Sequence, residues 1–483
     1  MEVLNILLCI ILSLPLIFLL SRHGRKKLPP GPPTLLFIAK FLLPGRSASH
    51  IGPMLRGLHA RHGPIFSFWL LRMFVFVDDR HLTHSVLVKG GGNFDGRPPP
   101  NGIMQLFFPH GIGTSPYGDY WRLLRRNLNV HALHPSRIRL LEPARQCARN
   151  AMLASLRADV GADASRVITV RPFLARCLFQ LIVEMSLGAR LGQEVLDELQ
   201  EMNRQIYLAM ARFPAFCFFP ALSMRRRWAQ YKTLRERQSK VLLPLIHSSR
   251  GTPCYAGSLL ELRVPEEGGR PLTDAEMVSL CSEFMVGAMD ASVAMMEWTM
   301  GELVNHPDAQ AKVYEEVRGK PELNEDDLRG MQYLRAVVLE SLRLHPGAHL
   351  ILPHAVQSDA EIAGYRVPKG AVINFLVADF GLDETAWTAA REFRPERFLD
   401  GDGDLDMTGS GEVKMAPFGA GRRMCPGHML SLLHAEYLVG ALVRDFQWLP
   451  PSGEDTTVDM TEEPGTFIVM KHRLRARIIP RTC

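Results

Sequence analysis

The amino-acid sequence predicts a mainly α-helical protein with a small β part, on three observations. From about residue 117 onwards, apolar residues recur with the period of an α-helix. Strand-like alternation occurs in two short segments, 64–79 and 364–379. Between these segments, one helical pattern continues without a proline from Thr273 to Pro307.

The elements follow from local patterns. Segment 64–79 alternates bulky and smaller residues in two bursts, which is typical of a hairpin at the edge of a sheet. The helical region is expected to break at Pro135, Pro172, Pro214 and Pro220. Phenylalanines in 213–219 precede three arginines at 225–227, a pattern that fits a membrane-contacting surface near a substrate entrance and buried helix ends equally well.

The longest predicted helix starts at a capping box, because Thr273 and Glu276 have the required spacing. At 1.5 Å per residue, a helix from there to Pro307 is roughly 50 Å long, enough to cross a whole domain. We therefore expect a central helix within one large catalytic unit.

Composition argues against nucleic-acid binding and against a disulfide framework. The 483 residues contain 56 Lys and Arg against 50 Asp and Glu, without a long run of like charge after residue 27. This mild basic excess fits an acidic protein partner or an anionic membrane, and no basic stripe or zinc module is present in the sequence. The eight cysteines form no CxxC pair, which predicts reduced thiols in the cytosol.

The N-terminal segment predicts a membrane anchor. Residues 3–20 are apolar except for Asn5 and Ser13, and basic residues follow directly at 22–27. The apolar run is near the minimum length for a membrane-spanning helix, and the positive-inside rule places everything after it in the cytosol. We expect an anchor at 1–20, a basic and proline-rich hinge at 21–33 and a catalytic domain at 34–483.

Segment 417–443 is the most informative about function. A glycine-rich loop with two arginines leads to Cys425 and then to a long apolar helix. A thiol at a helix N-terminus meets the positive end of the helix dipole, which favours its anion and the binding of a soft metal. Pro426 suits the first helical turn.

The neighbours of this cysteine fit a large flat ligand with carboxylates. Gly421 and Gly427 leave no side chain where such a ligand approaches the backbone. Phe418 can cover the apolar side of the sulfur, and Arg423 can bind a carboxylate. Thiolate, flat ligand and carboxylates together describe haem. The alternative is a buried structural cysteine, which is the usual fate of a lone cysteine.

The spacing of Phe418, Gly421, Arg423, Cys425 and Gly427 resembles the haem-binding signature of the cytochrome P450 superfamily, and the residues around it are similar to plant microsomal members. The resemblance implies the P450 fold, with haem b as cofactor and Cys425 as its axial iron ligand. It also implies a small lipophilic substrate and electrons from NADPH through a separate NADPH–cytochrome P450 reductase. The sequence itself contains no GxGxxG unit for binding a dinucleotide.

Further matches extend this resemblance. Segment 28–33 is similar to the proline-rich hinge of endoplasmic-reticulum members, which implies a single-pass protein of that membrane with its catalytic domain in the cytosol. Glu340 and Arg343 share a helix face, and the family joins this pair to the arginine of the PERF segment, here Arg397, in a structural role that fixes the backbone around the cysteine loop.

Other matched residues are expected around the haem. Trp121 and Arg125 lie four apart on one helical face and can bind a carboxylate, and in the family such residues hold a haem propionate. His354 stands where family members often place another propionate donor. By position in the family pattern, candidates for lining an apolar cavity, which plain core packing would explain equally well, are Leu106, Phe107, Met285, Met289, Leu350 and Ile351.

The oxygen-activating segment departs from the family pattern. Asp290 is kept, whereas Ala288 replaces the usual glycine and Ala291 replaces the threonine that relays protons. Cleavage of the O–O bond needs protons delivered by a positioned hydroxyl or an ordered water. Ser292 supplies a hydroxyl, although it is rotated by roughly 100° along the helix. A substrate hydroxyl or a water held by Asp290 is the other source.

The leading interpretation is a membrane-anchored haem-thiolate monooxygenase with Asp290 and Ser292 as catalytic residues. Because Ala291 lacks a hydroxyl, two alternatives stay open. One is a haem-thiolate isomerase or dehydratase that acts on hydroperoxides, and the other is a haem-binding protein with impaired oxygen activation.

Overall fold

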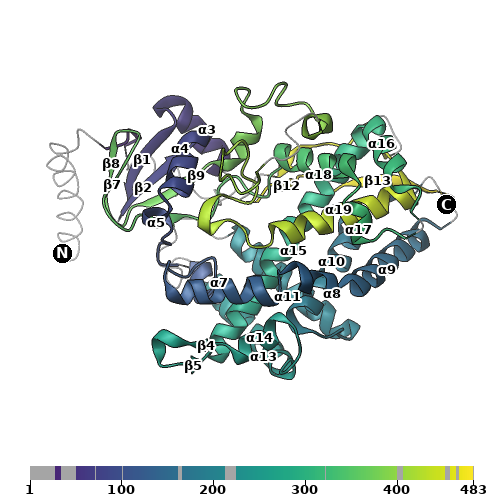
Figure 1. Ribbon diagram of the computed structural model, residues 1–483, viewed down its shortest axis with the longest axis horizontal. Coiled ribbons are helices and arrows are strands. Elements are labelled where there is room, and N and C mark those ends of the chain that lie inside the picture. The colour runs from purple at the N-terminus through teal and green to yellow at the C-terminus, as the bar shows by residue number, and fades with distance from the viewer. Residues whose placement is uncertain are drawn as a thin grey trace.

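The computed structural model describes residues 28–33, 51–70, 72–100, 102–161, 166–212, 225–320, 322–399, 406–451, 457–463 and 467–481. It confirms a mainly helical architecture with small sheets. In Figure 1 the sheet formed by β1, β2 and β9 lies on one side, and most helices form the rest of the molecule.

The helices begin and end as follows. Those of the first half are α3 (Ile51–His62), α4 (Arg80–His84), α5 (Gly91–Phe94), α6 (Gly102–Phe107), α7 (Asp119–His131), α8 (Pro135–Leu140), α9 (Glu142–Val160), α10 (Arg171–Leu187) and α11 (Gln193–Arg212). Those of the second half are α13 (Arg225–Ser248), α14 (Tyr255–Glu261), α15 (Asp274–Asn305), α16 (Pro307–Val317), α17 (Glu325–Leu328), α18 (Gln332–Leu344) and α19 (His428–Asp445). Shorter turns are the π-helix η2 (Ser85–Lys89) and the 3-10 helices η3 (Pro265–Glu267), η4 (Val377–Leu382), η5 (Pro395–Phe398) and η6 (Gly421–Arg423).

Two of the predicted proline breaks are confirmed, because Pro135 and Pro172 lie in the first turns of α8 and α10. The breaks at Pro214 and Pro220 lie outside the described residues, as does the aromatic cluster that precedes α13. Helices also occur before residue 117, where the sequence pattern did not indicate them.

The strands are short. They are β1 (Ile65–Leu70), β2 (Arg72–Val77), β3 (Val167–Thr169), β4 (Arg263–Val264), β5 (Arg270–Pro271), β6 (His354–Ala355), β7 (Ala360–Ile362), β8 (Tyr365–Val367), β9 (Val372–Phe375), β10 (Phe446–Leu449), β11 (Glu462–Glu463), β12 (Val469–Met470) and β13 (Arg475–Pro480). The largest sheet has the order β1-β2-β9-β6, in which β1 and β2 are antiparallel and β2 and β9 parallel. The hairpin predicted at 64–79 is therefore confirmed at a sheet edge, whereas the predicted strand at 364–379 divides into β8, β9 and the start of η4.

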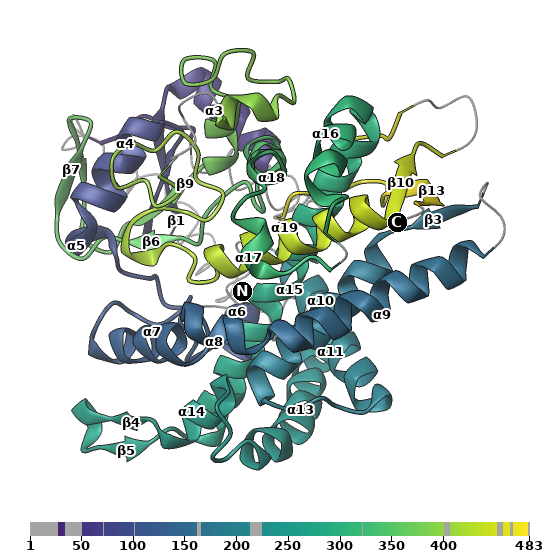
Figure 2. The ribbon, with the colours of Figure 1, turned by 45° about the vertical axis from the view of Figure 1, so that its right-hand side comes forward.

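The central helix is confirmed as α15. Thr273 accepts from the backbone of Glu276, and the Glu276 carboxylate accepts from the backbone of Thr273, which completes the capping box. Within the described part of the chain, α15 alone is long and apolar enough to cross a membrane, but 72% of its most apolar window is buried inside the protein. We conclude that α15 is a core helix, which Figure 2 shows crossing behind α19.

The proline-rich segment is not a free spacer along its whole length. The backbone N–H of Ser67 in β1 donates to the carbonyl of Pro30 at 2.7 Å, and the Ser67 hydroxyl donates to Pro29 at 3.0 Å. Pro29 and Pro30 thus pack against the first strand, because their carbonyls bind Ser67. The predicted anchor at 1–20 and the basic part of the hinge lie outside the described residues.

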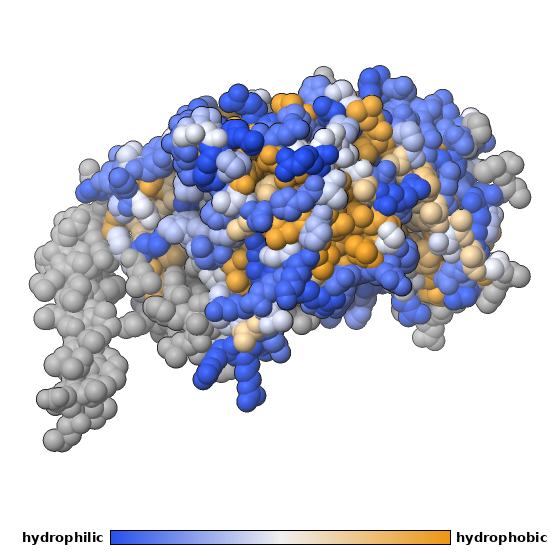
Figure 3. Space-filling model, turned by 90° about the horizontal axis from the view of Figure 1, so that it is seen from below, coloured by the Kyte–Doolittle hydropathy of each residue, from blue (hydrophilic) through white to orange (hydrophobic). Residues whose placement is uncertain are grey.

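The outer surface is mixed in polarity. Figure 3 shows the molecule from below, the side on which α13 and α14 lie in Figure 1. Apolar residues gather near the middle of this face, and hydrophilic residues surround them.

Candidate active site

Cys425 lies in the loop between η6 and α19. Its backbone N–H donates to the carbonyl of Phe418 at 2.9 Å, which closes the loop. The helix α19 begins at His428 with Gly427 as its N-cap. Pro426 therefore precedes the helix and is not part of its first turn, which corrects the prediction from sequence.

Cys425 forms no disulfide, and its surroundings do not favour the thiolate over the thiol. Burial raises the pKa of Cys425, whereas the amide of Gly427 and the guanidinium of Arg125 act in the opposite direction. A bound metal ion is the partner that deprotonates a coordinating thiol. The sulfur is thus suited to hold a metal once one is present.

The two glycines of this loop serve different purposes. Gly421 has φ +70°, and a Cβ there would lie 2.2 Å from the carbonyl oxygen of Leu87. Gly421 is therefore required by packing against η2, and its predicted place beside a flat ligand stays a prediction. At Gly427 a Cβ would meet only the Cys425 sulfur, at 4.0 Å, so the absence of a side chain keeps that side of the sulfur open.

Phe418 holds the loop through its backbone as well as its ring. Its carbonyl accepts the N–H of Cys425, and its ring centroid lies 6.1 Å from that of His428. The ring belongs to the main apolar cluster of the protein. Contact of this ring with a ligand on the sulfur stays a prediction.

Arg423 extends from the cysteine loop to the chain before α7. Its three guanidinium nitrogens donate to the backbone carbonyls of Asp95, Ile112 and Ser115, at 2.8, 3.2 and 3.0 Å. Within the described residues no carboxylate forms an ion pair with it. Burial lowers the pKa of Arg423 to about 10.

Arg97 lies beside this group and was missed from sequence. Its guanidinium donates to the carbonyls of Gly113, Leu352 and Pro353 at 2.9 to 3.0 Å. Burial and the charge of Arg423 lower the pKa of Arg97 to about 9. Two part-buried cations that repel each other favour an anion between them. In the sequence FDGRP, nothing local distinguishes Arg97 from an exposed surface arginine.

Trp121 and Arg125 occupy one face of α7, as predicted from their spacing. Arg125 is largely buried and donates to the carbonyl of Met424 at 2.7 Å, without a carboxylate partner in the described chain. The indole N–H of Trp121 donates to the carbonyl of Ile112 at 3.1 Å, and the Arg423 guanidinium lies 4.4 Å from its ring centroid. Because its single donor is engaged, Trp121 positions Arg423 in place of the direct carboxylate contact that was expected.

His354 also lies close to the arginines. Its Nδ1–H donates to the carbonyl of Phe94 at 2.7 Å, since a carbonyl can only accept. Burial and the charge of Arg97 lower the pKa of His354 well below its usual range. A neutral ring has no second N–H, so the predicted propionate contact requires a protonated His354.

The central helix presents an open face to this region. Gly287 and Ala291, one turn apart on α15, are exposed although most of the helix is buried. A methyl group added at Gly287 would meet no described atom within 4 Å, and one added at Gly347 would lie 3.9 Å from the methyl group of Ala291. The helix therefore borders a space at the level of the missing threonine hydroxyl.

Asp290 is turned toward α10. Its Oδ1 accepts from Arg171 at 3.2 Å, and Arg171 also donates to the buried Glu297 at 2.8 Å. The Oδ2 of Asp290 is buried without a hydrogen-bond partner in the described part of the protein. Burial raises the pKa of Asp290, against the effect of Arg171.

Ser292 is placed differently from its predicted role. Its hydroxyl lies 3.1 Å from the hydroxyl of Ser431 in α19, and the residue is buried. Gly287 and Ala291 lie on another side of the helix. The hydroxyl of Ser292 is thus paired with α19, and its assignment as a catalytic residue stays a prediction.

Glu283 on α15 is a second residue of this site that the sequence did not predict. The carboxylate of Glu283 on α15 accepts from the backbone N–H groups of Ile112 and Gly113, at 2.5 and 2.7 Å. It fixes the same loop whose carbonyls bind Arg423 and Trp121. No local pattern in the sequence around Glu283 indicated such a distant partner.

Glu340, Arg343 and Arg397 are in contact. Arg343 donates twice to the Glu340 carboxylate, at 2.7 and 2.8 Å, and Arg397 donates to the same carboxylate at 3.0 Å. Both Glu340 and Arg343 are fully buried, so this is not a surface salt bridge. Arg343 also binds the backbone carbonyls of Gly381, Ala390 and Glu392.

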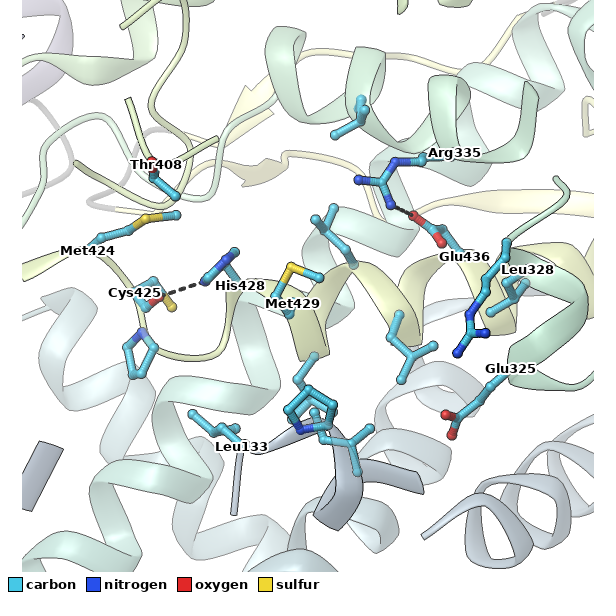
Figure 4. A pocket seen from close by; sticks show the side chains of 18 of the residues that line it. Leu133, Glu325, Leu328, Arg335, Thr408, Met424, Cys425, His428, Met429 and Glu436 are labelled. Atoms are coloured by element: carbon cyan, nitrogen blue, oxygen red, sulfur yellow. Dashed lines mark hydrogen bonds and ion pairs between the residues drawn. The ribbon is translucent and has the colours of Figure 1, made fainter. Parts of the chain in front are cut away.

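An open hollow of about 1170 Å³ lies beside the cysteine loop, lined mainly by residues of α7, α8, α17, α18 and α19 (Figure 4). Met424, Cys425 and His428 lie at one end of it, and the ion pair between Arg335 and Glu436 lies at the other. Its lining is largely apolar, and Arg139, Arg329 and Arg335 add positive charge.

The arrangement fits a haem. Gly427 leaves one side of the Cys425 sulfur open, and α15 exposes Gly287 and Ala291. Three part-buried arginines without carboxylate partners among the described residues, Arg97, Arg125 and Arg423, would neutralise two propionates.

Comparison with known proteins decides the family. The family model described as Cytochrome P450 matches residues 29–478. The chain belongs to the cytochrome P450 family. This P450 is accordingly a haem protein and an oxidoreductase that incorporates oxygen into its substrates.

Its relatives include plant enzymes. The P450 is 38% identical to "Cytochrome P450 89A9" of Arabidopsis thaliana, with all of both chains covered. It is 29% identical to "Ent-cassadiene hydroxylase" of Oryza sativa subsp. japonica, over 91% of this chain and 89% of the other. A zebra fish cytochrome P450 structure with abiraterone has a TM-score of 0.74 at 20% identity, covering 89% of this chain and 100% of the other, and it confirms the P450 fold.

Proposed function

We propose that this P450 is a membrane-anchored monooxygenase that inserts one oxygen atom of O2 into a small lipophilic substrate, with electrons from NADPH delivered by a separate reductase. The observation that carries the proposal is the site around Cys425, whose sulfur is open on the side of Gly427. Arg125 donates to this loop and Arg423 belongs to it, and neither forms an ion pair with a carboxylate of the described chain. The anchor at 1–20 would hold the protein in the endoplasmic reticulum membrane with the catalytic domain in the cytosol.

The side chains have distinct tasks in this proposal. Cys425 binds the iron, and Arg97, Arg125 and Arg423 bind the acid groups of the haem. Haem with a thiolate ligand supplies cleavage of the O–O bond and oxidation of unactivated carbon. The protein excludes water, orients the substrate over Gly287 and Ala291, and provides protons.

The hollow next to Cys425 supports docking of an acidic electron-transfer partner. Its rim carries Arg139, Arg329 and Arg335, and its acidic residues Glu325 and Glu436 are largely buried. Burial raises the pKa of Glu436 to about 7, which reduces its negative charge. Positive potential around an apolar floor is complementary to an acidic protein surface.

Asp290 is the residue that we expect to hold the water that supplies protons. Its Oδ2 has no partner within the described structure, so an ordered water bound there would satisfy a buried acceptor. Such a water would stand in for the hydroxyl that Ala291 lacks. The salt bridge with Arg171 keeps the carboxylate in place.

Reconstitution tests the reaction class. We expect full-length protein in lipid nanodiscs with a plant NADPH–cytochrome P450 reductase to consume NADPH and O2 in the presence of lipophilic plant metabolites. Products should carry one oxygen atom from isotopically labelled O2, detected by mass spectrometry. The proposal is wrong if turnover requires a fatty-acid hydroperoxide and proceeds without reductase or NADPH. That outcome would establish the isomerase or dehydratase class, which the bare face at Ala291 favours.

Restoring the family hydroxyl is a second prediction. Ala291→Thr is expected to raise the product formed per NADPH, on the order of threefold, because a hydroxyl at this position can relay protons to dioxygen. The matched control is Ala291→Val, which has a similar volume and no hydroxyl. Product and hydrogen peroxide are measured together. Equal yields from both variants would assign the proton to the substrate or to a water, and the absence of product in all forms would support a haem-binding role.

A further inference from the structure

Two polar side chains of α11 face the central helix. Asn203 and Tyr207 are four residues apart and therefore lie on the same side of α11, which packs against α15. Asn203 is only 4% exposed, and its Nδ2 donates to the sulfur of Met289 at 3.5 Å. Within the described residues its carbonyl oxygen accepts no hydrogen bond. This amide oxygen is therefore free to accept a hydrogen bond from a ligand or a water.

Tyr207 links this amide to the space over Ala291. Its ring stacks on Phe467 at 5.0 Å, and Phe467 forms a β-bridge with Ala348. The neighbouring Gly347 is in turn close to the methyl group of Ala291. The contacts thus connect α11 through residues 467 and 347–348 to the open face of α15.

The Tyr207 hydroxyl is also available. It forms no hydrogen bond with any described residue, and the ring is partly buried. Burial and the negative charge of Asp290 raise the pKa of Tyr207, so the phenol stays protonated and can donate or accept. Arg171, the nearest strong donor to Asp290, is already engaged by Asp290 and Glu297.

The two groups define what they can bind. The Asn203 carbonyl accepts, and the Tyr207 hydroxyl both donates and accepts. A hydroxyl of a ligand matches both groups, because it can donate to Asn203 and accept from Tyr207. Met289, Phe467 and Ala291 add apolar surface that suits a hydrophobic body, and the nearby charges of Asp290 and Arg171 are paired with each other.

We propose that Asn203 and Tyr207 determine specificity by binding a hydroxyl group at the end of an otherwise apolar substrate. This inference rests on the proposed function, since it names the substrate class of that same site: lipophilic alcohols or phenols. The oxidised carbon then lies at the opposite, apolar end of the molecule, over Gly287 and Ala291.

The test uses two probes of nearly equal shape, 4-phenylphenol and 4-methylbiphenyl. Full-length protein is titrated with each while the absorption change of the haem on ligand binding is recorded. We expect the phenol to bind about tenfold more tightly than the methyl compound in the wild type. Asn203→Leu and Tyr207→Phe should each reduce this preference to about twofold, while the affinity for 4-methylbiphenyl changes by less than about twofold.

Controls separate specificity from loss of the haem site. Gln205→Leu serves as the matched variant, because Gln205 lies on another side of α11 and its amide donates to Glu201. Each variant must retain the carbonyl-complex band of a thiolate-bound haem. If that band is absent from the wild type, the proposed haem-thiolate function itself is wrong. If the band is present and the wild type shows no preference for the phenol, or both variants keep that preference, the assignment of Asn203 and Tyr207 is overturned.

Discussion

Replacing Cys425 with alanine is expected to abolish the carbonyl-complex absorption band of thiolate-bound haem and to lower the rate of substrate oxidation by at least about a thousandfold. The physical reason is that the sulfur supplies the electron donation that favours O–O cleavage. Within the described residues no cluster of three His, Cys, Asp or Glu side chains is arranged to hold a metal ion. No such cluster among the described residues can therefore bind the iron in place of Cys425.

The structure also shows why a hydroxyl is a poor substitute. Burial opposes the charge even on the thiol of Cys425, and a serine hydroxyl is far less acidic and a harder ligand than sulfur. Cys425→Ser is thus expected to lose the thiolate band as the alanine variant does, although it preserves the shape of the loop. Difference spectra of the reduced, carbon monoxide-treated protein provide the measurement.

The matched control is Cys147→Ala. Cys147 is exposed on α9 and is a free cysteine like Cys425, so its removal should leave the band unchanged. Circular dichroism shows whether each variant has kept its helices. Survival of the thiolate band in Cys425→Ala, with the fold intact, would overturn the ligand assignment and most of the proposed function with it.

Features set by neighbours in the sequence were predictable. The capping box of Thr273 and Glu276 involves residues three apart, and the helix that it starts ends two residues before Pro307, as α15. The alternation of 64–79 likewise determined the hairpin of β1 and β2, because a tight connection leaves few other pairings. In both cases the deciding interactions lie within one segment.

Contacts that were not predicted depend on distant partners. The hydroxyl of Ser292 is taken by Ser431, and the indole of Trp121 by the carbonyl of Ile112. Gly421 is a glycine because of the backbone of Leu87. No pattern within the local segment identifies a partner that the fold brings from far along the chain.

Arg97 and Asn203 were missed for a related reason. Each is a single polar residue outside any recognisable motif. Its importance comes from the contacts that it makes in the folded protein. Arg97 acquires its role from Arg423, which follows more than 300 positions later. Asn203 acquires its role from an acceptor that the described residues leave unpaired. Such sites are recognised only when donors and acceptors are matched in three dimensions.

Arg343→Ala is the second change with a large expected effect. It should lower the free energy of unfolding by about 3–5 kcal/mol, because it leaves the buried Glu340 carboxylate without its main partner. It also removes the donor that binds the carbonyls of Gly381, Ala390 and Glu392. Those carbonyls belong to the segment that leads to Arg397, so loss of haem is expected to accompany unfolding.

A comparison with a surface ion pair isolates burial as the cause. Arg318→Ala breaks the pair with Glu315, in which both side chains are more than half exposed, and should change stability by less than about 1 kcal/mol. Thermal unfolding and haem content are measured for both variants in detergent. Replacing Glu340 and Arg343 together with apolar residues should not restore full stability, since the three carbonyls would still lack their donor. If Arg343→Ala were no less stable than Arg318→Ala, the buried network would not be what holds the region between α18 and the cysteine loop.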